Sequence, residues 1–327
     1  MPYLNQQFVT VGVARQSTKG TPAAAATFNH GLISGAGATL SPAHSPVATT
    51  AGVRAYNQVD RTNIKPGFSF DSKAYVKSVG MWLVASHGSL VDSGAGPYTH
   101  TVTASLTQTL PYVTFWGQTD SMWVQVRDAM VDTFELNFDE NGVVTVKVDG
   151  FGTVPTIGTT PPTVTNSDLQ GNYLSALGGS MKFDTLTGTP VAAVIRSGSY
   201  TLQNNINDLP DATNILPADT YPGNRSVTVK VVVDVQDTTV YRAIVGGSTS
   251  AVAMSQTPVY GSAEFNFVEY GGTGTLKTST PRIAWTIDDP KADPKGGPVT
   301  LTLTGTVLAG VGVTDVTQVL INGITTY

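Results

Sequence analysis

The sequence predicts an all-β protein, and three observations support this fold class. Threonine, which favours strands, occurs 47 times. The acidic residues comprise 19 Asp and only 4 Glu, although Glu is the better helix former. Stretches in which apolar and polar residues alternate recur along the chain, separated by segments rich in Gly and Pro.

Composition sets further limits on structure and function. The 327 residues are 40% hydrophobic and 13% charged, which is enough apolar material for a core in one large β domain or in two domains. A net charge of -5 and the lack of a Lys/Arg run argue against a protein that binds nucleic-acid phosphates tightly. The absence of Cys excludes disulfides, thiol catalysis and Cys-ligated metals. Residues 1–7 lack a signal-peptide pattern and no apolar run reaches membrane length, so we expect no membrane partner.

The clearest pair of strands lies near the middle of the chain. Residues 133–139 alternate strictly, so that three apolar side chains share one face, and residues 144–149 alternate in the same way. Gly142 in the connection favours a tight turn. This pattern predicts a hairpin with one buried face.

The same alternation predicts strands at 226–236, 281–288 and 299–307. Weaker patterns predict further strands at 8–15, 67–74, 98–104, 111–117, 124–132, 191–205, 264–270 and 314–321.

Two stretches have the spacing of short helices, and each directly follows a predicted strand. In the first, Asp71 or Ser72 is the expected N-cap and Gly88 the expected end. In the second, Asp237 is the expected N-cap and Gly246 begins the expected end. Helices placed in this way lie on a β-sandwich rather than connect the strands of a parallel sheet.

The order of strand, helix, strands and hairpin occurs once in each half of the chain. Between the halves, residues 153–165 contain three prolines, which is a linker composition. The sequence thus predicts two β domains related by duplication, 1–155 with a long N-terminal loop and 166–327. The alternative is one embellished domain over 1–327, because any two hairpins look alike.

Several long segments, including 18–64 and 204–223, lack the apolar residues for a core of their own. We expect them to become ordered against neighbouring copies of the protein, as assembly loops.

No arrangement of residues indicates catalysis or a cofactor. The four histidines lack metal-ligand spacing, and His87 and His100 are expected to be partly exposed. Asp288, Asp289 and Asp293 lack the register of a calcium loop, so they predict an exposed turn. We therefore expect no catalytic residue, no metal and no cofactor, which favours a structural role.

The order of these features resembles the tail tube (major tail) proteins of long-tailed, siphovirus-type bacteriophages. The resemblance begins with the strand and polar turn Val11-Gly12-Val13-Ala14-Arg15-Gln16-Ser17-Thr18-Lys19-Gly20-Thr21-Pro22-Ala23. It continues through Gly96–Val102, Leu110–Thr114 and the hairpin at 133–150 to Gly223-Asn224-Arg225 before a Val/Thr strand. It spans nearly the whole chain.

The resemblance implies a tail-tube-type β-sandwich or barrel-forming domain with one short flanking helix. It implies stacked rings of three or six copies around a channel through which duplex DNA passes without specific binding. It further implies a place in the virion tail after synthesis in the host cytoplasm, with the tape measure protein and the tail terminator and baseplate proteins as partners. A single tube domain would fill about half of the chain, which leaves duplication or embellishment open.

Two other functions remain open from the residues alone. Another virion β-sandwich component, such as a baseplate or decoration protein, could bind a partner or glycan. A secreted polysaccharide-active enzyme is disfavoured, because no carboxylate pair and no signal peptide are evident.

If the hairpins form the inner sheet of a tube, their polar faces line its channel. The alternative is that the polar faces lie on the outer surface. The lumen-facing candidates are Asp132, Glu135, Lys147, Asp149, Asp234, Asp288, Thr300, Thr302 and Thr304.

Overall fold

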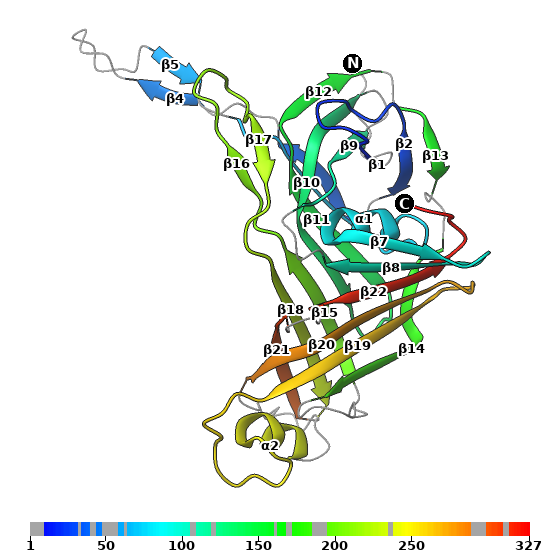
Figure 1. The fold of residues 1–327 in the computed structure, drawn as a ribbon, viewed down its shortest axis with the longest axis vertical. Coiled ribbons are helices and arrows are strands. Elements are labelled where there is room, and N and C mark those ends of the chain that lie inside the picture. Colours follow the sequence, from blue (N-terminus) through cyan, green and yellow to red (C-terminus); the bar gives the residue numbers. More distant parts are fainter. Residues whose placement is uncertain are drawn as a thin grey trace.

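A computed structural model describes residues 10–31, 34–39, 44–47, 58–61, 64–104, 109–118, 122–159, 162–167, 172–184, 195–234, 238–288, 299–309 and 314–327. The fold is all-β, as the composition predicts, with two short helices among the described residues (Figure 1). The strands of the body pair into one closed, barrel-like network, which we describe as three sheets that share strands.

The largest sheet, which we call the main sheet, is antiparallel throughout and contains the predicted hairpin. Its order is β3 (Ser34–Thr39), β6 (Gly67–Lys73), β11 (Val144–Phe151), β10 (Trp123–Phe138), β15 (Ile195–Gln203), β18 (Ser226–Asp234), β21 (Thr300–Val307) and β20 (Thr275–Ile287). Strands from both halves of the sequence therefore join in one continuous sheet, through the β10–β15 pairing.

Two outer sheets cover the apolar face of the main sheet. The first has the order β13 (Val164–Ser167), β2 (Ala26–Gly31), β1 (Thr10–Arg15), β9 (Val113–Gln118), β10 and β12 (Val154–Gly158). The second has the order β14 (Leu174–Asp184), β19 (Tyr260–Glu269), β20, β22 (Thr317–Asn322), β8 (Tyr98–Ala104) and β7 (Gly88–Ser93). Strands β10 and β20 are long enough to belong to both layers.

Strand β10 changes layer at a bulge around Asp128, which has a left-handed φ of 51°. Its buried carboxylate accepts hydrogen bonds from Gln16 Nε2 at 2.9 Å and from the Gly20 backbone N–H at 2.6 Å. The Asp128 backbone N–H donates to Gln16 Oε1 at 2.7 Å. These bonds satisfy the buried polar groups and hold the N-terminal turn against the corner.

The core lies between the layers and uses the predicted alternation. The apolar side chains of the main-sheet strands are buried, among them Phe134, Leu136, Val146, Val229 and Leu303. Each such side chain stabilises the fold by about 1.5–3 kcal/mol. Strand alternation therefore fixes which face of the main sheet meets the outer sheets.

Helices α1 (Val79–His87) and α2 (Thr239–Gly246) occur where the sequence predicts helices. Gly88 ends α1 in a left-handed conformation, as expected, and Gly247 does the same for α2. The predicted N-caps of α1 are wrong, because β6 continues through Asp71 and Ser72 and the helix begins after Ser78. Asp237 lies outside the described residues.

Two hairpins extend from the main sheet at the end opposite α2 (Figure 1). They are β4 (His44–Val47) with β5 (Gln58–Arg61), and β16 (Asn207–Leu209) with β17 (Asp219–Tyr221). Each hairpin connects two adjacent main-sheet strands, β3 to β6 and β15 to β18.

The segment 18–64 differs from its predicted character. Strand β2 pairs with β1 and buries Phe28, and β3 pairs with β6. The expectation that 18–64 needs a neighbour for order is thus wrong for residues 18–31, because they pack on their own chain. The Pro-containing segment 153–165 likewise includes β12, which pairs with β10.

The two histidines expected to be partly exposed are both buried. The His87 ring lies 2.9 Å from Tyr200 Oη and 3.0 Å from the Leu83 carbonyl oxygen. The His100 ring lies 2.7 Å from Asp92 Oδ1 and 3.1 Å from Asn322 Oδ1. Burial is tolerated because every ring nitrogen has a hydrogen-bond partner.

Candidate functional site

The surface of the main sheet that faces away from the core is its polar face. Cross-strand pairing aligns polar side chains from neighbouring strands into rows. One row runs across seven strands through Lys73, Thr145, Asn137, Ser199, Lys230, Thr304 and Thr286. The polar face is therefore a continuous surface and not a set of separate sites.

An acidic cluster lies on β10 and β11. Glu135 is paired in register with Lys147, and Asp149 with Thr133. Burial raises the pKa of Asp149; Lys147 opposes this increase, whereas Asp132 and Glu135 add to it. Asp132 Oδ1 also accepts a hydrogen bond from the Ile206 backbone N–H at 2.6 Å. The first four lumen-facing candidates thus form one group of interacting charges.

The other candidates lie on β18, β21 and the end of β20. Asp234 forms an ion pair with Arg196, with 2.6 Å between Oδ1 and Nε. Thr300, Thr302 and Thr304 are paired in register with Asp234, Val232 and Lys230. Asp288 is exposed, and its backbone N–H donates to the Thr302 carbonyl oxygen at 3.1 Å. That these residues face a channel stays a prediction.

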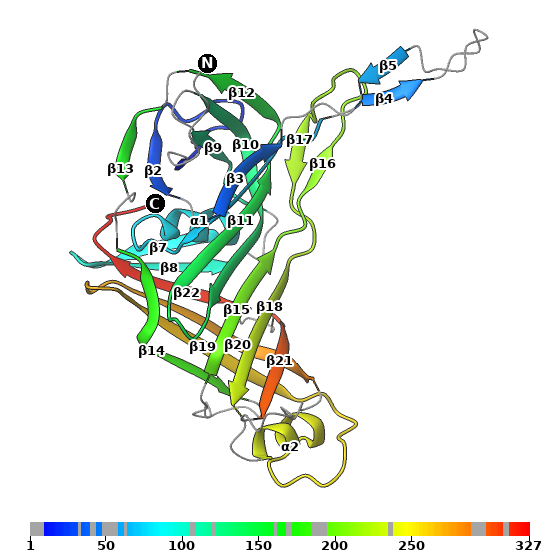
Figure 2. The ribbon, with the colours of Figure 1, turned by 180° about the vertical axis from the view of Figure 1, so that it is seen from behind.

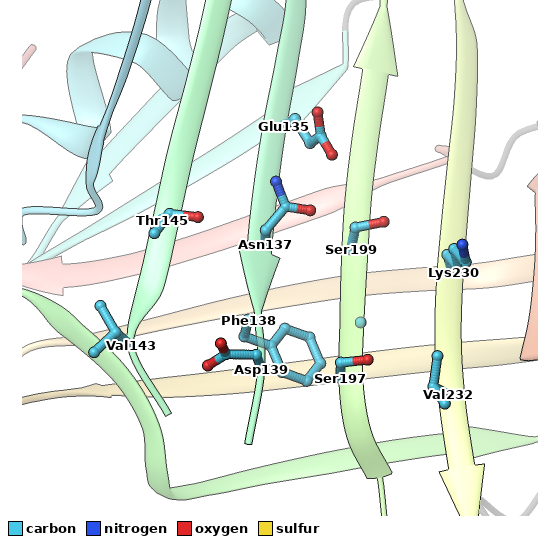
Figure 3. Close-up of a pocket in the computed structure, with 11 residues that line it drawn as sticks. Glu135, Asn137, Phe138, Asp139, Val143, Thr145, Ser197, Ser199, Lys230 and Val232 are labelled. Carbon is cyan, nitrogen blue, oxygen red and sulfur yellow. The ribbon is translucent and has the colours of Figure 1, made fainter. Parts of the chain in front are cut away.

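A hollow of about 400 Å³ opens on the polar face around Gly198 (Figure 3). Glu135, Asn137, Ser199 and Lys230 line it from three adjacent strands. A side chain at position 198 would collide with the Phe138 ring, since an added Cβ would lie 2.6 Å from it. Lys230 was not among the predicted residues. Its position on β18, opposite the Val stripe, could have indicated that it lies on the polar face.

The chemistry of this surface is that of a mixed-charge wall. Within the described residues, no group of three or more His, Asp or Glu side chains could hold a metal ion. None of the described helices has the length and apolar character to cross a membrane.

The main sheet consists of two units with the same connectivity. Unit one is β3, β6, β11 and β10, and unit two is β15, β18, β21 and β20. In each unit, the first strand leads through a projecting hairpin to the second, a helix follows, and a later hairpin supplies the other two strands. In each unit the chain then continues into an outer strand that pairs with the long strand of that unit. Strand β12 pairs with β10, and β22 pairs with β20.

The units also share a detail of packing. Gly150 of β11 and Gly305 of β21 both face the core beside an aromatic ring. An added Cβ would lie 2.4 Å from the Phe68 ring at Gly150 and 2.8 Å from the Trp285 ring at Gly305. Each unit thus has Gly at the equivalent position of its strand, where an aromatic ring packs directly on the backbone.

Comparison with known families identifies a match to a family model described as "Phage tail tube protein", over residues 9–307. The comparison with curated proteins gave no match.

Proposed function

Because the chain belongs to the phage tail tube protein family, we propose that its copies assemble into stacked rings whose common channel passes the viral genome. In this function the protein is a structural subunit of the virion tail, and no residue is assigned to catalysis. The observation that carries the proposal is the repeated four-stranded unit of the main sheet.

The strand count supports three copies per ring. Two units give eight main-sheet strands per chain, so three chains supply 24 strands. Strands about 4.8 Å apart and tilted about 40° then close a barrel about 48 Å across. After subtraction of side chains, a bore of about 35–40 Å remains, which admits duplex DNA. With this stoichiometry, 1–155 and 166–327 are two tube domains in one chain.

The contact between neighbouring copies follows from the contact inside the chain. Units one and two join where β10 pairs with β15 in antiparallel fashion over Thr133–Phe138. The equivalent edges for a second copy are β3 of unit one and the end of β20 in unit two. Strand β19 covers that side of β20 as far as Ala284, so Trp285–Ile287 have no strand partner there among the described residues. Pairing with β3 of the next copy would protect both edges.

The same geometry supports a polar face that lines the channel. The apolar face of the main sheet is covered by the outer sheets, so closure of the main sheet into a barrel directs the polar face inward. Glu135, Asp149 and Asp234 then lie on a mixed-charge wall that also carries Thr side chains and the cations Lys73, Lys147, Lys230 and Arg196. Such a wall does not bind phosphates tightly and lets the duplex slide.

The decisive experiment is cryo-electron microscopy of tubes formed by the purified protein. Three chains per ring, with β3 beside β20 of the next chain, are expected. Six chains per ring would contradict the two-domain proposal but would leave the tube function intact. Absence of rings and tubes would contradict the function itself. Contacts with the tape measure, terminator and baseplate proteins belong to the same proposal, and co-purification of tails tests them.

The lining is tested by charge reversal. Phage tails carrying Glu135→Lys with Asp149→Lys should assemble but eject DNA more slowly at low salt, with recovery at high salt. Glu264→Lys, on outer strand β19, is the matched control and should leave ejection unchanged. Normal ejection by the double variant would place the polar face on the outside of the tube.

A further inference from the structure

An apolar hollow lies beside α2 at one end of the molecule. It measures about 980 Å³. Tyr241, Ile244 and Val245 of the helix line it, together with the loop after α2 and with Thr286 and Ile287 at the end of β20. In that loop the Val252 and Met254 side chains are 96% and 80% exposed. Large apolar side chains that gather so openly on a surface mark a site of contact with another molecule.

A second group of exposed apolar side chains lies on the β16–β17 hairpin. Leu209 is 51% exposed, Tyr221 is 50% exposed, and Ile215 in the connection is also exposed. The hairpin precedes β18 and α2 comes after it, so the length of that strand separates the two groups. Figures 1 and 2 show the hairpin and α2 at opposite ends of the molecule.

The charges at the two ends are complementary. Asp211, in the hairpin connection, accepts hydrogen bonds from the Thr213 backbone N–H at 2.8 Å and from Thr213 Oγ1 at 2.7 Å. These bonds lower the pKa of Asp211, so it is ionised at neutral pH. Arg242 is exposed on α2 beside the hollow. Neither side chain forms an ion pair with another described residue.

We infer that the β16–β17 hairpin of one copy docks into the α2 hollow of a second copy in the adjacent ring. The inference rests on the proposed tube function. Two different patches at opposite ends of one chain make a head-to-tail contact, which repeats without closing and builds a filament. Leu209 and Tyr221 enter the hollow against Val252 and Met254, and Asp211 meets Arg242 at its rim.

Cross-linking tests the contact directly, because the chain contains no Cys. Tubes of the variant Leu209→Cys with Met254→Cys are treated with a short bis-maleimide and analysed on a denaturing gel. The expected product is a ladder that extends beyond the number of chains in one ring. A ladder that stops at the ring number would mean that a neighbour in the same ring covers α2, and it would overturn the inference. Assembled tubes without cross-links would also overturn it.

The matched control pairs Met254→Cys with Val91→Cys, since Val91 is also well exposed but lies on β7. It should give no ladder. If the cysteine variant does not assemble, Leu209→Arg provides the second measurement. It should leave rings intact and abolish tube elongation, and tubes of normal length would overturn the inference. Failure of the unmodified protein to form rings would instead contradict the proposed function.

Discussion

Helices α1 and α2 occupy the same place in the two units but have very different surroundings. All nine residues of α1 are buried, whereas Ala243 is the buried residue of α2. Helix α1 contacts β1, β7, β8 and β10. In addition, the Tyr327 ring packs so closely on Gly80 that a Cβ there would lie 2.2 Å away.

The difference comes from the chain segment that comes after each helix. After α1 the chain forms the β7–β8 hairpin, and β8 pairs with β22 to extend the second outer sheet. After α2 it forms the irregular loop with Val252 and Met254. The chain therefore covers α1 completely and covers the equivalent helix α2 only in part.

The largest effect is expected from truncation of an aliphatic side chain on each helix. Leu83→Ala in α1 removes a fully buried side chain and should lower the free energy of unfolding by about 2–5 kcal/mol. Ile244→Ala in α2 removes a half-buried one and should cost less than about 1.5 kcal/mol. Urea unfolding of unassembled protein gives both values. Equal losses would show that α2 is as well covered as α1 within the chain.

The second-largest effect is expected from acid, which should lower the free energy of unfolding through His87 at the end of α1. Burial lowers the pKa of His87 from 6.5 to about 3. Below pH 6.5 the unfolded chain therefore binds a proton that the folded protein does not. Stability is lost by up to about 1.4 kcal/mol per pH unit, down to pH about 3.

His87→Gln removes this titration. The melting temperature of the variant should be lower at pH 7 but should fall less between pH 7 and 4 than that of the unmodified protein. Thermal unfolding across this pH range measures the slopes. Parallel slopes would mean that His87 takes up its proton in the folded protein as well.

The polar faces of the two units differ in charge, and this difference predicts a smaller effect. Asp149 in unit one corresponds to Thr304 in unit two. Because the pKa of Asp149 is raised on folding, its ionisation destabilises the folded state at neutral pH. Asp149→Asn should therefore raise the melting temperature at pH 7, and the gain should vanish below about pH 4. Thr304→Ser is the control. A gain that persists in acid would point to a cause other than ionisation.

The smallest effect is expected for the rim charges of the inferred contact. Exposed ion pairs contribute about 0.2–1 kcal/mol each. Asp211→Arg or Arg242→Asp alone should slow tube elongation severalfold at low salt, and the two together should restore it. Light scattering during assembly measures these rates. If the double variant elongates no faster than the single variants, Asp211 and Arg242 do not contact each other in the tube.

The strands and helices could be predicted where one of their faces is buried. In such strands apolar and polar residues alternate, and in such helices an apolar stripe ends at a Gly, so burial is visible in the sequence. The hairpin at 133–150 and the strand at 226–234 are examples. Eight of the nine lumen-facing candidates alternate with core residues in the sequence, whereas Asp132 has the spacing of Phe134 and Leu136 and lies at the register shift of β10. Their assignment to a channel is a prediction that needs the assembled tube.

Other features could not be predicted because their partners are distant in sequence. Strand β2 has little apolar character, and its order comes from pairing with β1 and, in parallel, with β13. The burial of His87 depends on Tyr200, 113 residues away. Asp128 carries no local sign of its left-handed conformation, which Gln16 and Gly20 stabilise from the N-terminal turn.

The β10–β15 pairing has a consequence for the rate at which a ring is built. If three chains close the ring, three of its six unit-to-unit junctions are already made when the chains fold. A tethered junction forms at the effective concentration set by the connecting segment, which is millimolar for short flexible tethers. Only two associations between separate molecules are then needed, instead of five for six single-unit subunits, so ring nucleation should depend on a lower power of protein concentration.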